Sequence, residues 1–200
     1  MKKSIIISLT FFIIFSNNIY SQQTVDVTNI ESCSNHECNN NKYYKDIYNN
    51  YGNFIGTWQH TSGNMTFEVV VFKKEMMPYI LALNSYRDEI SLKYKMIRDK
   101  GLSTEAIIYR SDKNLTGTNK PWPDIFSSPS NSSNIFGGLI IDNCITSTAS
   151  YPYLMGRLRF ELNTSANPVT AHWTVKRFSG LRLSDEPDFT IPKDIVLTKQ

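Results

Sequence analysis

The chain has 200 residues and a formal net charge of +3, from 21 Lys or Arg against 18 Asp or Glu. This small charge gives no reason to expect nucleic acid or an anionic membrane as a partner. The length suits one domain that buries a sizeable core, and the aromatic content of 12% favours strands over helices.

Residues 1–21 have the architecture of a cleavable secretory signal peptide. Lys2 and Lys3 form a basic start, residues 5–15 form an apolar run, and Ser21 supplies a small residue at the expected cleavage point. The apolar run is shorter than the roughly 20 residues that span a bilayer. We therefore expect a secreted or periplasmic mature protein that does not span a membrane. Its formal charge would be +1, since removing two lysines from +3 gives 3 − 2 = 1.

Three cysteines remain after such cleavage, at positions 33, 38 and 144. In an oxidising compartment, the spacing of Cys33 and Cys38 permits a local disulfide, and either residue can instead pair with Cys144. A metal site formed by Cys33, His36 and Cys38 is the alternative, because thiolate and imidazole suit zinc. The spacing matches no common zinc module, so we expect a disulfide and no metal or cofactor.

The start of the mature chain predicts little regular structure. Residues 22–41 are polar and are expected to form a tail or loop. Tyr44, Ile47 and Tyr48 then recur at helical spacing, which predicts a short helical turn capping one end of the main domain.

From Phe54 onward the hydrophobic period becomes two, which is typical of half-buried strands. The pattern predicts an all-β domain over residues 42–200, an antiparallel meander forming a barrel or half-barrel of about eight strands. Residues 76–84 are interpreted as a connection over the core, and residues 98–101 as a hairpin turn. The expected strands cover residues 54–60, 65–72, 89–96, 104–109, 135–142, 156–162, 169–176 and 195–199.

The segment Phe54-Ile55-Gly56-Thr57-Trp58 resembles the first strand of lipocalins and of intracellular fatty-acid-binding proteins. This resemblance implies a structural role for Gly56 and Trp58 at the closed end of a barrel. The layout over residues 42–200 is similar to a family of small secreted lipocalin-like bacterial proteins of unknown function. The chain departs from true lipocalins because it has no Thr-Asp-Tyr segment and no C-terminal helix. Which basic residue packs on Trp58 is open.

A small barrel either fills with its own side chains or encloses one ligand. If it encloses one, we expect a small hydrophobic molecule in an apolar pocket formed by Phe67, Tyr94, Phe160 and Trp173. The polar stretch 111–134 would then form a lid that carries Trp122. The alternative is a side-chain-filled core in a module that binds an extracellular or envelope protein through aromatic-rich loops.

Catalytic patterns are weak throughout the chain. It has no Gly-x-Ser-x-Gly nucleophile motif, no phosphate-binding glycine loop and no dinucleotide fingerprint. His60 and His172 fall at a strand end and on a polar strand face, where histidines are usually solvated or hydrogen-bonded. The sequence therefore predicts a protein that is not an enzyme.

Overall fold

The computed structural model describes residues 22–30, 40–111, 127–129, 134–142, 153–178 and 187–200. Within these ranges the chain is all-β, as the hydrophobic pattern predicts. Apart from the one-turn 3₁₀ helices η1 (Val27–Asn29) and η3 (Leu81–Leu83), every described element is a strand. The strands are β1 (Gln23–Asp26), β2 (Lys42–Lys45), β3 (Gly56–Ser62), β4 (Met65–Ile80), β5 (Ser85–Arg98), β6 (Ala106–Arg110), β7 (Ser127–Pro129), β8 (Ile135–Asp142), β9 (Leu154–Asn163), β10 (Thr170–Arg177) and β11 (Asp194–Lys199).

All these strands belong to one sheet with the order β1-β2-β5-β4-β3-β11-β10-β9-β8-β7, and β6 pairs with β5. The β1–β2 and β2–β5 ladders are parallel, and the other ladders are antiparallel. The sheet is therefore mixed. The expected antiparallel pairing holds among β3–β11, whereas β1 and β2 pair in parallel. Strand β7 pairs with β8 and also with β5, where Ser127 faces Ile90.

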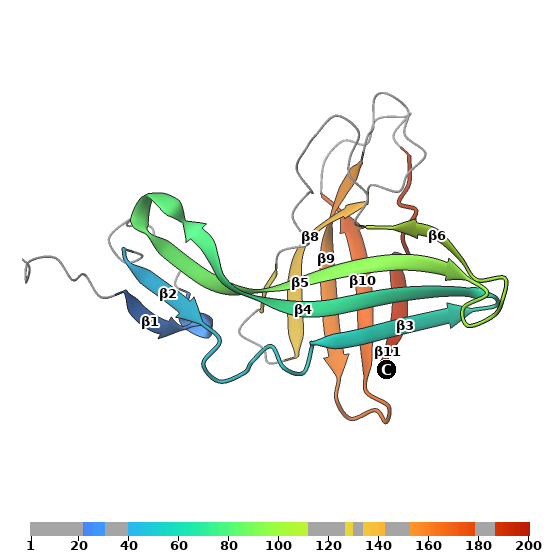
Figure 1. Cartoon of the computed structure of the whole chain (residues 1–200), viewed down its shortest axis with the longest axis horizontal. Helices are drawn as coiled ribbons and strands as arrows, with labels where there is room; N and C mark the ends of the chain where they lie inside the picture. The colour runs from blue at the N-terminus through green and yellow to red at the C-terminus, as the bar shows by residue number, and fades with distance from the viewer. Residues whose placement is uncertain (1–21, 31–39, 112–126, 130–133, 143–152, 179–186) are drawn as a thin grey trace, which may run out of the picture.

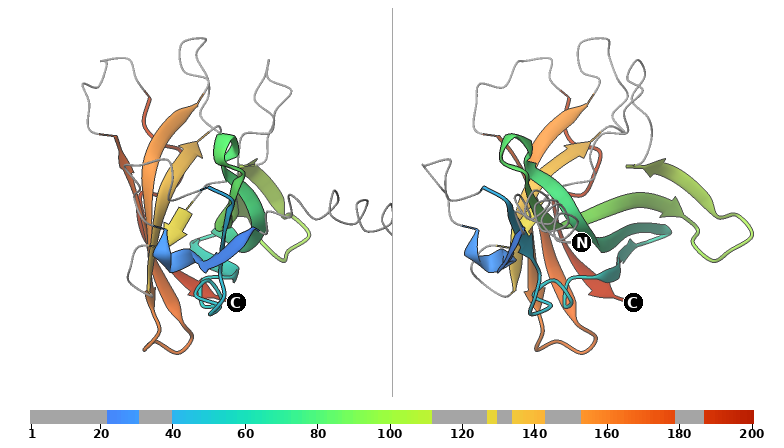
Figure 2. Two further views of the ribbon diagram at one scale, coloured as in Figure 1. Left: turned by 90° about the vertical axis from the view of Figure 1, so that its left-hand side faces the viewer. Right: turned by 60° about the vertical axis from the view of Figure 1, so that its left-hand side comes forward.

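The β4–β5 hairpin runs along most of the molecule (Figure 1). One half lies across β3 and faces β8–β11, and the other half projects outward with β1 and β2 along its side. We call the projecting part the arm (β1, β2 and residues 73–89) and the remaining strands the body. Figure 2 shows β8–β10 as one wall of the body and β4–β6 as the opposite wall. The buried hydrophobic side chains lie between these walls.

The N-terminal segments differ from the sequence-based expectation. Part of the expected tail forms β1 and η1, and the expected helical turn at 42–48 is wrong because residues 42–45 form β2. Tyr44 is buried on this strand against Tyr79, whereas Ile47 and Tyr48 are 50% and 77% exposed. The helical spacing of these three residues therefore does not correspond to one buried face.

A buried carboxylate connects the arm strands. Asp88, whose side chain is fully buried, accepts hydrogen bonds from the Tyr43 hydroxyl (2.6 Å) and from the backbone N–H groups of Asp46 (2.9 Å) and Met76 (3.1 Å). A register shift between Lys74 and Met77 accompanies this contact, and Met76 has a positive φ of 53°. The interpretation of residues 76–84 as a connection is thus wrong for residues 76–80, which continue β4.

Candidate functional site

The four side chains predicted to form a pocket lie together inside the body. Phe67, Tyr94, Phe160 and Trp173 come from β4, β5, β9 and β10, and each is at most 2% exposed. The Phe67 ring centre lies 5.8 Å from that of Tyr94 and 5.4 Å from that of Trp173, which lies 6.5 Å from Phe160. The four rings therefore form one contiguous cluster at distances typical of favourable aromatic pairs.

Two further aromatic residues that the sequence-based list omits complete this cluster. Phe136 on β8 stacks on Phe160 with ring centres 4.8 Å apart and planes at 11°. Phe54, just before β3, meets Phe136 edge-on at 5.2 Å. Both side chains are fully buried. The hydrophobic pattern at residues 135–142 places Phe136 on a strand, but only the β8–β9 register brings it to Phe160.

The polar ring atoms of the cluster have partners on the backbone. The Tyr94 hydroxyl donates to the carbonyl of Ile141, and the Trp173 indole N–H donates to that of Pro192, both at 2.8 Å. Buried tyrosines and tryptophans usually require such partners. These bonds fix both rings in the interior.

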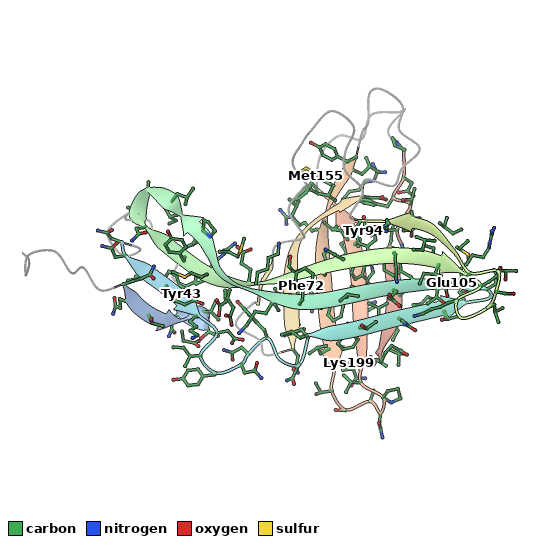
Figure 3. All side chains as sticks on the ribbon, in the orientation of Figure 1. Tyr43, Phe72, Tyr94, Glu105, Met155 and Lys199 are labelled. Carbon is green, nitrogen blue, oxygen red and sulfur yellow. The ribbon has the colours of Figure 1, made fainter. Side chains whose placement is uncertain are left out.

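The predicted structural motif lies where β3 meets β11. Trp58 is fully buried and donates its indole N–H to the carbonyl of Phe54 at 2.8 Å. Lys199, labelled beside β3 in Figure 3, lies over the indole at 5.3 Å and donates to the carbonyl of Asn53 at 2.9 Å. Gly56 has φ +135°, and a Cβ there would lie 3.1 Å from Lys199 Cε. Lys199 is therefore the basic residue that packs on Trp58.

The other predicted site residues lie outside the described residues. These are the lid residue Trp122 and the candidate disulfide partners Cys33, Cys38 and Cys144. The lid and the disulfide stay predictions. Among the described residues, no cluster of His, Cys, Asp and Glu has the geometry to hold a metal ion.

The outward face of β8–β10 carries a groove of about 760 Å³. We call it the outer groove. The residues that line it are Ile135, Gly137, Arg157, Leu158, Arg159, Glu161, His172, Thr174, Lys176, Arg177 and Asp194. Alternation along β9 creates this face, because Leu158, Phe160 and Leu162 point into the core while the residues between them point outward. At Gly137, the absence of a side chain leaves backbone as part of the groove wall.

The strand register sorts the groove residues into rows. In the first row, Glu161 of β9 faces His172 of β10; in the second, Arg159 faces Thr174. The second row continues to Gly137 on β8 and to Asp194 on β11. In the third row, Arg157 faces Lys176.

The polar side chains of the first two rows have partners within the groove. Arg159 makes an ion pair with Glu161 at 2.9 Å, and His172 lies 2.6 Å from Asp194. The His172 and Asp194 side chains are 48% and 72% exposed, so this pair lies in open solvent.

The third row is different because two cations face each other directly. Neither Arg157 nor Lys176 makes an ion pair with any residue that the structure describes. Like charges on directly opposed residues of an antiparallel pair are destabilising. The charged groups lining the outer groove are Arg157, Arg159, Lys176 and Arg177 against Glu161 and Asp194. Arg177 is also paired with Asp188 at 3.4 Å, and counting this partner leaves a balance of 4 − 3 = +1.

An aromatic side chain adjoins the cationic row. The Arg157 guanidinium lies 5.3 Å from the ring centre of Phe178, which is 42% exposed. Phe178 borders a second hollow of about 430 Å³ that shares Gly137, Arg157 and Leu158 with the outer groove. The two hollows therefore adjoin and offer cations, hydrogen-bonding groups and one exposed ring.

Residues 1–127 match a family described as "Family of unknown function (DUF6705)". The chain belongs to this family. The DUF6705 match includes the arm and β3–β6, whereas the groove strands β8–β11 follow it in the chain. No curated protein and no solved structure matches this chain.

Among the described residues of this DUF6705 protein, no helix has the length and apolar character that a membrane crossing requires. The expected strands 156–162 and 169–176 contain most of the groove residues, but the sequence did not identify the groove. The missing information is the β9–β10 register, which determines that Arg157 faces Lys176.

Proposed function

We propose that this DUF6705 protein is an exported, non-catalytic binding protein that holds an anionic partner in its outer groove. The observation that carries this proposal is the direct opposition of Arg157 and Lys176, for which no described residue supplies an ion-pair partner. An anion bound between the two cations would remove their repulsion and gain charge-assisted hydrogen bonds.

The packing of the interior favours a ligand site on the surface of the protein over one inside the body. Phe67, Tyr94, Phe160 and Trp173 pack against one another, and Phe136 stacks on Phe160. Small barrels whose inward side chains meet in this way are filled by them. Transport of a small hydrophobic molecule in an apolar pocket is the alternative function.

The proposal includes a lipocalin-like barrel as the framework. Two observations support it. β7 pairs with β8 and, through the single pair Ser127–Ile90, also with β5. In addition, Lys199 of β11 lies over the indole of Trp58 in β3.

Export is proposed from residues 1–21, with cleavage after Ser21. Native mass spectrometry of the protein purified from its own host tests export and the filled interior together. We expect the bare mass of residues 22–200. A stoichiometric apolar adduct, identified after organic extraction, would contradict the filled interior and support the carrier function. A mass that retains residues 1–21 would contradict cleavage.

The groove is tested by retention of the mature protein on envelope material from its own host. We expect salt-sensitive retention that is lost in the double variant Arg157→Gln/Lys176→Gln. Lys45→Gln is the matched control, because Lys45 is an exposed strand cation in the arm. Undiminished retention of the double variant would show that the groove is not the binding surface.

A further inference from the structure

We infer that the partner of the outer groove is an acidic polysaccharide whose sugar residues carry carboxylates, as in a polyuronate. This inference rests on the proposed binding function of the groove and specifies its ligand. The groove combines cations, an aromatic ring and polar side chains, and the inference follows from this combination and from the order of these groups across the strands.

The cationic row supplies the site for the carboxylate. Arg157 and Lys176 are opposed across β9 and β10, so their Cβ atoms lie about 5 Å apart. A planar guanidinium donates two parallel hydrogen bonds to a carboxylate, and the lysine ammonium adds a point charge. One carboxylate can therefore contact both cations and compensate the charge that no described residue balances.

The aromatic edge supplies a surface for a sugar ring. Phe178 is 42% exposed and follows β10 directly, two residues beyond Lys176. Its ring is already in contact with Arg157. A pyranose that places its carboxylate on the cationic row can thus lay an apolar face over Phe178 or the backbone of Gly137 and Gly138, which border the adjoining hollow.

The polar rows supply partners for hydroxyl groups. The side chains of Thr174, Glu161 and Asp194 line the groove beside the cations. Hydroxyl groups both donate and accept hydrogen bonds, so they can use carboxylate, hydroxyl and guanidinium partners together.

The same polar rows argue against a densely acidic polypeptide. Glu161 and Asp194 would repel an uninterrupted series of carboxylates, since like charges at close range cost free energy. A chain that alternates carboxylates with hydroxyl-bearing ring atoms matches the observed order of cations and carboxylates. The volume of about 760 Å³ lies within the range for sites that accept ligands of a few rings.

Titration calorimetry with a tetramer of galacturonic acid tests this inference on the mature protein. The comparison ligands are its fully methyl-esterified form, which lacks the charge, and tetraglutamate, which carries carboxylates without sugar rings. We expect the uronate to bind at low salt and to bind more weakly as salt is added. We expect the ester, which loses the charge-assisted contact, to bind at least about tenfold more weakly. We expect the peptide to bind more weakly as well, because it has no sugar ring to contact Phe178 and because Glu161 and Asp194 repel its closely spaced carboxylates.

Variants locate the site. Arg157→Gln and Lys176→Gln are each expected to weaken uronate binding about tenfold or more. Phe178→Ala is expected to weaken it severalfold, and Lys45→Gln should leave it unchanged. Uronate binding that is unaffected by Lys176→Gln would overturn the inference, because the ligand would then bind elsewhere.

The outcomes separate this inference from the proposed function. If tetraglutamate binds as tightly as the uronate and depends on Lys176, the polysaccharide assignment fails and the groove remains a site for an acidic protein segment. If neither ligand shows binding that depends on Arg157 and Lys176, the inference fails, and the envelope-retention assay decides whether the groove function survives. Circular dichroism spectra of all variants establish that each one is folded.

Discussion

Lys199 Nζ lies 5.3 Å from the centre of the Trp58 ring. This contact joins β11, the last strand of the body, to β3, the first. The lysine also donates to the carbonyl of Asn53. Its stem lies 3.1 Å from the position that a Cβ at Gly56 would occupy. The glycine and the lysine therefore depend on each other at this junction.

We predict that Lys199→Met lowers the free energy of unfolding by about 1–2 kcal/mol, because it removes a cation–π contact and a hydrogen bond. Trp58→Ala should cost about 3–5 kcal/mol, as expected for deleting a buried aromatic side chain. Urea denaturation measures both, with Lys45→Met as the exposed control. A Lys199→Met variant as stable as the wild type would show that the lysine does not stabilise the junction.

Phe160→Ala should destabilise the protein by about 3–5 kcal/mol and leave an apolar cavity. The removed ring is fully buried and lies 5.1 Å from Trp58 and 4.8 Å from Phe136. Such cavities accept small apolar molecules. We therefore expect benzene to raise the melting temperature of the variant and to leave that of the wild type unchanged. A comparable benzene effect on the wild type would show that its interior already holds a cavity.

Glu68 should make stability sensitive to acid. Burial raises the pKa of its carboxyl, but hydrogen bonds and charge interactions from Lys100 and Lys95 outweigh this effect and hold the pKa below its ordinary value of 4.5. The folded state therefore releases the Glu68 proton more readily than the unfolded state. The stabilisation is fully present above about pH 5 and is lost as the pH falls through the lowered folded-state pKa.

Urea denaturation between neutral and acidic pH tests this titration. We expect Glu68→Gln to be less stable than the wild type at neutral pH, and we expect the difference to shrink as the pH falls. In the Glu68→Gln background, Lys100→Met should have little further effect, because the ion pair is already absent. A difference that stays constant with pH would contradict the lowered pKa.

Asp88→Ala should loosen the arm. The substitution leaves the buried N–H groups of Asp46 and Met76 without their acceptor, at about 1–3 kcal/mol for each. Hydrogen exchange should accelerate first at β2 and at residues 74–80, and less at β9 and β10. Uniform acceleration through the whole sheet would contradict a local role for this carboxylate. Asp88→Asn, which keeps one acceptor oxygen, should have an intermediate effect.

The sequence predicted the body better than the arm. Alternation at residues 90–96 and 156–162 is strong because one face of each strand is buried, and both segments are strands in the structure. β1 and β2 are short and polar, and their partners are distant in the chain, so no local pattern reveals them. The candidate site depends on register in the same way. Arg157 and Lys176 fall in the expected strands 156–162 and 169–176, and only the β9–β10 pairing shows that they are opposed.

The outer groove places two cations opposite each other, and we propose that they bind an acidic ligand. Lys176→Glu tests it directly, because it creates an opposite-charge pair with Arg157. Unfolding by urea and titration with the galacturonate tetramer should be measured on the same variant. We predict that its free energy of unfolding rises by about 1 kcal/mol while uronate affinity falls at least about tenfold. A variant that is less stable than the wild type, or that keeps its uronate affinity, would contradict the claim.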